Sequence, residues 1–70
     1  MKMKDLEDIT NSEIERVINE YIHSERDRKI MKRRLIDGIC YEPLADEFDL
    51  STVAVKKIVY KSERVIFRHL

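Results

Sequence analysis

The stretch at residues 41–60, YEPLADEFDLSTVAVKKIVY, constrains the fold of this chain more than any other segment. Its apolar residues recur three and four positions apart in two groups, which is the spacing of two amphipathic helices. The groups meet at Asp49 and Leu50, and Ala45 is the small residue that two crossing helices need for close approach. The expected inward residues are Leu44, Phe48, Leu50, Val55 and Ile58. This pattern predicts a helix-turn-helix, with Ser51 as the N-cap of its second helix.

The length and composition favour a single domain spanning residues 1–70. The chain has 70 residues with 1 Gly and 1 Pro, so hairpins and long loops are not expected. The predicted fold class is all-α: a compact four-helix domain with a C-terminal helix-turn-helix and a long last helix. A chain this short has a small core and little room for an enzyme cleft.

Cap signals set the expected limits of the first helix. Residues 1–9 are polar, and we expect them to be flexible. Thr10 and Glu13 fit a capping box, in which a hydroxyl and a carboxylate each accept a bond from a backbone N–H. An apolar stripe then predicts a helix to about Ile22.

Start and stop signals also set the expected limits of the other three helices. Ser24 is the expected N-cap of a second helix, and Gly38 supplies the left-handed conformation that commonly ends one. Pro43 falls in the first turn of the expected third helix, where its missing N–H has no partner to lose. The fourth helix is expected to begin after Ser51 and to meet no breaker before Leu70.

The zero net charge conceals a separation of charge along the chain. Residues 51–70 carry five basic residues and one acidic residue, a net charge of +4, and residues 1–50 carry −4. Within the first part, residues 26–34 contain six basic residues and one acidic residue. Two basic segments beside acidic ones indicate one positive face, which is the electrostatic signature of nucleic-acid binding.

The second helix of a helix-turn-helix enters the major groove of double-stranded DNA, with its N-terminal residues against base edges. The candidates for base reading are Thr52, Val53, Lys56, Lys57 and Tyr60. The candidates for phosphate contact are Lys61, Arg64, Arg33 and Arg34.

Structural roles compete with these assignments. The lysines also fit a solvated face, and Tyr41 and Tyr60 fit packing better than base stacking. Phe67 and Leu70 fit either core packing or a homodimer contact, and the sequence leaves both open.

Other classes of site find no support in the sequence. Cys40 is the only cysteine, so no internal disulfide forms and a reducing, cytoplasmic compartment is expected. We expect Cys40 to be a small buried or capping residue. His23 and His69 lie far apart without neighbouring ligands, so no metal is expected. We also expect no cofactor, no catalytic residues, no enzymatic activity and no membrane span.

From Glu25 onward the sequence resembles region 4 of the sigma-70 family of bacterial sigma factors. The resembling segments are ERDRKIMKRRLIDGICYEPLADEF and DLSTVAVK. Family members have an Arg-rich helix, an aliphatic-Asp-Gly turn, a Tyr-Glu-x-aliphatic-Ala helix and a Ser-capped recognition helix with Val-Lys. Here these correspond to residues 26–34, Ile36 to Gly38, Tyr41 to Ala45, Ser51, and Val55 with Lys56.

The resemblance implies binding of duplex DNA, contact with RNA polymerase and no catalysis, as in a small transcriptional regulator of the phage or mobile-element type. Asp49 replaces the Gly usual at the turn, and Val53 and Ala54 stand where many members carry polar base readers. Two alternatives stay open. One is a protein-interaction module that binds RNA polymerase or a sigma factor without reading DNA. The other is the DNA-recognition part of phage packaging machinery.

Overall fold

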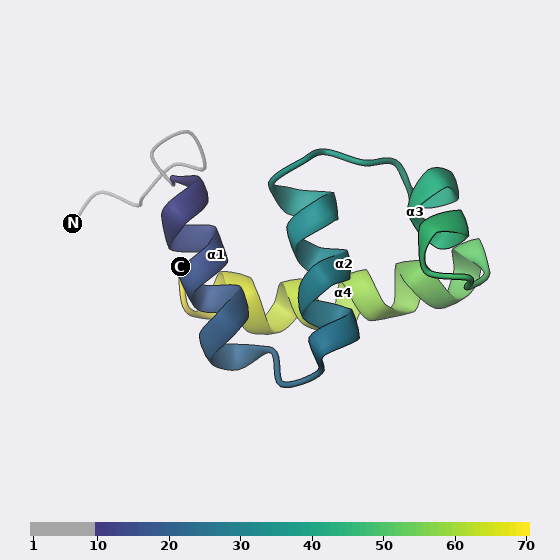
Figure 1. Ribbon diagram of the computed structural model, residues 1–70. Helices are drawn as coiled ribbons and strands as arrows, with labels where there is room; N and C mark the ends of the chain where they lie inside the picture. The colour runs from purple at the N-terminus through teal and green to yellow at the C-terminus, as the bar shows by residue number, and fades with distance from the viewer. Residues whose placement is uncertain (1–9) are drawn as a thin grey trace.

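The longest helix, α4 (Thr52–Arg68), is the element on which the other three helices pack (Figure 1). In the computed structural model, which describes residues 10–70, α3 (Tyr41–Glu47) lies against the N-terminal half of α4. The middle of α4 is crossed by α2 (Glu25–Leu35), and α1 (Asn11–Tyr21) lies at its C-terminal half. Residues 10–70 contain no β-strand, so the all-α, four-helix prediction is confirmed. The prediction for residues 1–9 lies outside the described residues.

The predicted N-caps explain where three of the helices begin. The Thr10 hydroxyl oxygen accepts the Glu13 amide N–H at 3.1 Å, and the Ser51 hydroxyl oxygen accepts that of Ala54 at 3.1 Å. Ser24 caps α2 in the same way, at 3.3 Å. Each hydroxyl satisfies an N–H that the first turn of a helix leaves without an intrahelical partner.

The chain between α2 and α3 reverses at Gly38, as predicted. Its φ of +70° is the left-handed conformation, which Gly adopts without the steric cost of a Cβ. Cys40 then occupies the N-cap position of α3, but its side chain makes no capping bond. Of the two roles expected for Cys40, burial is wrong because the residue is exposed, whereas the capping position is the one it occupies.

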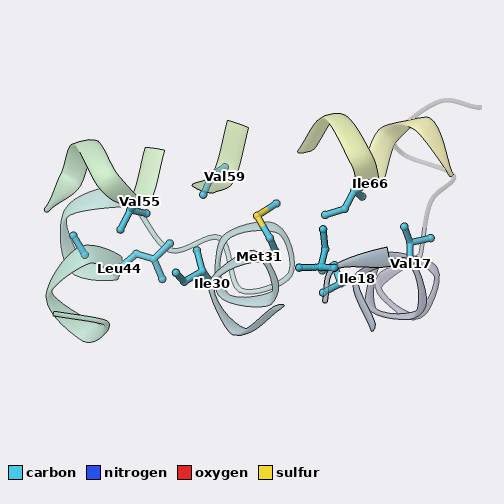
Figure 2. Close-up of a cluster of buried hydrophobic side chains, with 10 residues drawn as sticks. Val17, Ile18, Ile30, Met31, Leu44, Val55, Val59 and Ile66 are labelled. Atoms are coloured by element: carbon cyan, nitrogen blue, oxygen red, sulfur yellow. The ribbon is translucent and has the colours of Figure 1, made fainter. Parts of the chain in front are cut away.

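The core is one continuous strip along the inner side of α4 (Figure 2). Leu44, Ile30 and Val55 fill the end near α3, whereas Val17 and Ile18 meet Ile66 at the end near α1. Of the predicted inward residues of α4, Val55 is buried and Ile58 is half-buried against the core. Val59, Ser62 and Ile66 lie on the same side of the helix and are also buried. Because the core contacts only one side of α4, the opposite side of this helix is exposed to solvent.

Tyr21 and Phe67 are exposed, whereas Leu70 packs on the core. Tyr21, expected to face inward, is 36% exposed, and its ring stacks on that of His69 with centroids 3.6 Å apart. Leu70 is half-buried against the core. Phe67 is 45% exposed, so it is not a core residue.

Candidate nucleic-acid interface

The turn between α3 and α4 is closed by the backbone itself. The Leu50 amide N–H bonds to the Ala45 carbonyl at 2.9 Å, and that of Asp49 bonds to Asp46 at 3.3 Å. Together these are the two bonds of a Schellman motif, whose C′ residue takes the left-handed conformation. Asp49 is that residue, with a φ of 56°, where Gly is usual. The motif folds Leu50 back toward α3 and fixes the point at which α4 starts.

The small residue at the predicted crossing is buried. Ala45 is 3% exposed and neighbours Leu44, which is fully buried, so α3 presents a flat face to α4. This contact leaves the N-terminal end of α4 projecting beside the turn (Figure 1). α1 packs at the other end of α4 and does not cover this end.

The structure places the base-reading candidates on the outer part of α4. Lys56 and Lys57 are exposed, Val53 is 62% exposed and Tyr60 is 53% exposed. Thr52 is half-buried. All five side chains thus retain access to solvent, and the helix they share is held from its opposite side by Val55 and Val59.

Four cations form a row along the exposed side of α4, which we call the basic row: Lys57, Lys61, Arg64 and Arg68. They are spaced four, three and four residues apart, so they lie on one side of the helix. All four are exposed, and none makes an ion pair or hydrogen bond with another described residue. Over 11 residues the row extends about 16 Å, and its charges are free to meet an anion.

The basic residues of α2 differ from those of the basic row, because they are engaged within the fold. The Arg33 guanidinium donates from Nη2 and Nε to Glu47 Oε1, at 2.9 and 3.1 Å, and from Nη1 to Asp37 at 3.0 Å. The bonds to Glu47 raise the pKa of Arg33 above its already high ordinary value. A phosphate contact by Arg33 therefore requires it to leave two carboxylates.

Arg34 belongs to an aromatic cluster centred on Tyr41. Its guanidinium carbon lies 4.4 Å from the centroid of the Tyr41 ring, and Lys56 Nζ lies 5.6 Å from the same centroid. Tyr60 approaches that ring edge-on, with centroids 6.3 Å apart. Through Tyr41, Arg34 lies near Lys56 and Tyr60 of α4, whereas Arg33 is bonded to Glu47.

The same cluster perturbs one phenol. Tyr41 raises the pKa of Tyr60, chiefly because negative charges on the two phenolates would repel each other. Tyr60 therefore remains neutral near pH 7, and it offers a hydroxyl rather than a negative charge beside the lysines.

No protein-family model, curated protein or solved structure matches this chain.

Residues 10–70 contain no candidate metal cluster and no candidate membrane-spanning helix. No three His, Cys, Asp or Glu side chains there gather closely enough to hold a metal ion. Within the same residues, every helix is too short or too polar to cross a lipid bilayer.

One member of the basic row was missed by sequence reasoning. Arg68 was counted in the charge of the C-terminal segment but was not assigned to the site. Its spacing of four residues from Arg64 was the available signal, since it continues the row by one turn.

Proposed function

We propose that this chain is a small, non-enzymatic transcriptional regulator that binds double-stranded DNA with α3 and α4. In this proposal the N-terminal end of α4 enters the major groove, where Lys56 and Lys57 donate to guanine O6 and N7. Thr52 and Val53 contact thymine methyl groups, and Tyr60 lies at the rim of the groove.

The observation that carries the proposal is the unpaired state of the basic row. Most basic side chains of α1 and α2 are engaged within the fold, through carboxylates such as Glu47, through backbone carbonyls or through the Tyr41 ring. Those of the basic row are not, although the described residues include many carboxylates. Exposed cations along a helix that fits the major groove are placed to contact the phosphates that border the groove.

The proposal extends to the setting of the protein. It places the chain among regulators of the sigma region 4 type, of phage or mobile-element origin, in the cytoplasm. A single module of this size buries limited surface on DNA, so useful specificity calls for a homodimer or for contact with RNA polymerase.

Two measurements test the DNA-binding proposal. Selection of bound duplexes from a random pool should enrich one motif, and the symmetry of that motif gives the stoichiometry. Titration of affinity against salt should give a steep linear loss on logarithmic axes. Replacing Lys61, Arg64 and Arg68 together by Gln should reduce that slope by about 2.7, or roughly 0.9 per lost phosphate contact.

Lys29→Gln is the matched control, because Lys29 is an exposed cation on α2 whose Nζ lies 3.7 Å from Glu25. It should leave the slope unchanged. No binding at low salt, or an equal effect of the control, contradicts the proposal.

A second candidate is an interaction module that binds RNA polymerase or a sigma factor without reading DNA. The exposed Val53 at the tip of α4 favours it, because an apolar side chain there gives no hydrogen-bond readout. Failure of duplex binding together with capture of purified polymerase would support this candidate.

A further inference from the structure

The exposed side of α4 carries a second pattern that base reading does not use. Of the four exposed large hydrophobic residues among residues 10–70, three are on α4: Val53 at 62%, Tyr60 at 53% and Phe67 at 45%. They are spaced seven residues apart and extend over about 21 Å of helix. A repeat of seven on one helix is the spacing that a second helix packs against.

Two cations alternate with these apolar residues. Lys57 and Arg64 each lie four residues after one apolar residue and three before the next. The order Val53, Lys57, Tyr60, Arg64, Phe67 therefore forms a single line with the four-three spacing of a helix-packing seam. We call these five residues the outer seam.

The charge of the outer seam argues against a second copy of this chain. Pairing two α4 helices in parallel would bring Lys57 to Lys57, and pairing them antiparallel about Tyr60 would bring Lys57 to Arg64. Each copy of residues 51–70 also carries a net charge of +4. Like charges at facing positions of a helix pair select against that pairing.

We propose that the outer seam docks an acidic amphipathic helix of a partner protein. Apolar side chains of that helix pack on Val53, Tyr60 and Phe67, and its carboxylates lie between them, opposite Lys57 and Arg64. Neither cation has a partner among the described residues, so the partner's carboxylates neutralise charge without breaking an existing ion pair. Like a DNA strand, such a helix carries a line of negative charges that can lie along α4.

The docked helix would exclude DNA, because Val53, Lys57 and Tyr60 belong both to the outer seam and to the proposed base-reading end. This exclusion rests on the proposed function, whereas the docking itself does not. Substitution of Phe67 distinguishes docking from DNA binding, because Phe67 belongs to the outer seam but not to the proposed base-reading residues. It lies near the opposite end of α4, about 21 Å from Val53.

The test uses the full chain and a synthetic 21-residue helix with Leu and Glu alternating at the four-three positions. A matched peptide carries Lys in place of each Glu. Fluorescence anisotropy should show binding of the Glu peptide and not of the Lys peptide. Phe67→Ser should weaken the Glu peptide about tenfold or more, and Arg64→Gln about threefold.

Tyr21→Ser is the control, because it removes the exposed aromatic residue that lies on α1 rather than on the outer seam. It should leave peptide affinity unchanged, and circular dichroism of each variant verifies that the helices remain folded. The Glu peptide should also displace a labelled duplex from the wild-type chain, and Phe67→Ser should raise the peptide concentration needed for displacement about tenfold or more while preserving duplex affinity.

The other outcomes distinguish failure of the docking, failure of the exclusion and failure of the proposed function. Equal binding of the two peptides, or none, removes the docking site. If the chain dimerises and Phe67→Ser abolishes the dimer, the outer seam binds a second copy of the chain. If Phe67→Ser weakens duplex binding as much as peptide binding, the outer seam binds DNA. Simultaneous binding of peptide and duplex overturns the exclusion. Peptide binding without duplex binding leaves the docking intact and contradicts only the proposed function.

Discussion

The amide N–H of Leu50 and the carbonyl oxygen of Ala45 are 2.9 Å apart, and the bond between them closes the turn that aims α4. This bond requires the chain to pass through a left-handed residue, which is Asp49 with a φ of 56°. A left-handed conformation costs most L-residues about 1–2 kcal/mol, with Asp and Asn at the lower end. The turn therefore retains some backbone strain at a position close to the proposed interface.

Asp49→Gly should relieve that strain. Gly has no Cβ to clash in the left-handed region, but it loses more chain entropy on folding. We expect a net gain of about 0.5 kcal/mol in the free energy of unfolding, measured by urea denaturation. Asp49→Val should instead lose 1 kcal/mol or more, roughly, because a β-branched residue tolerates this conformation poorly. A loss of stability in Asp49→Gly would mean that the Asp49 side chain contributes to the turn.

Replacing Arg33 should distinguish a structural cation from a DNA-binding one. Arg33 is held by Glu47 and Asp37, so Arg33→Gln should leave the slope of logarithmic DNA affinity against logarithmic salt unchanged. Lys61→Gln, in contrast, should lower it by about 0.9. Both are measured by anisotropy with the same duplex. A similar drop for Arg33→Gln would place Arg33 on a phosphate, as the sequence alone suggested.

Ile66→Ala should be the most damaging single change on α4. Ile66 is fully buried and lies near Val17 and Ile18 of α1 (Figure 2). Removing its side chain should cost about 2–5 kcal/mol from lost burial and the cavity that remains. Phe67→Ala, at the adjacent exposed position, should cost about 0.5 kcal/mol or less. Thermal unfolding followed by circular dichroism measures both, and equal losses would show that Phe67 is packed.

Tyr41→Phe should lower the pKa of Tyr60 toward its ordinary value of about 10. Tyr41 raises the pKa of Tyr60, so the folded state holds the Tyr60 proton more tightly than the unfolded chain does. The resulting stabilisation is fully present below the ordinary pKa and is lost as pH rises through the raised value. Tyrosinate absorbance during alkaline titration, compared with Tyr60→Phe, measures the shift. An unchanged pKa of Tyr60 in Tyr41→Phe would assign the shift to burial or to Glu63.

The sequence by itself determined the helices and the positions of their ends. The helix ends depend on contacts between residues that are close in sequence, so they can be predicted without knowing the fold. The residues that set them are Thr10, Ser24, Ser51 and Gly38. The inward stripe of α4 was equally predictable, because the period of a helix fixes which of its residues share a side.

Only the tertiary structure decided which charges remain free. Arg33 and Glu47 are 14 residues apart, and no local pattern indicates that they pair. The stacking of Tyr21 on His69 likewise joins residues from opposite ends of the described chain. An ion pair or ring contact depends on distances between separate helices, and these are fixed by the packing of α1, α2 and α3 on α4. That packing engages the cations of α2 within the fold and leaves those of the basic row exposed.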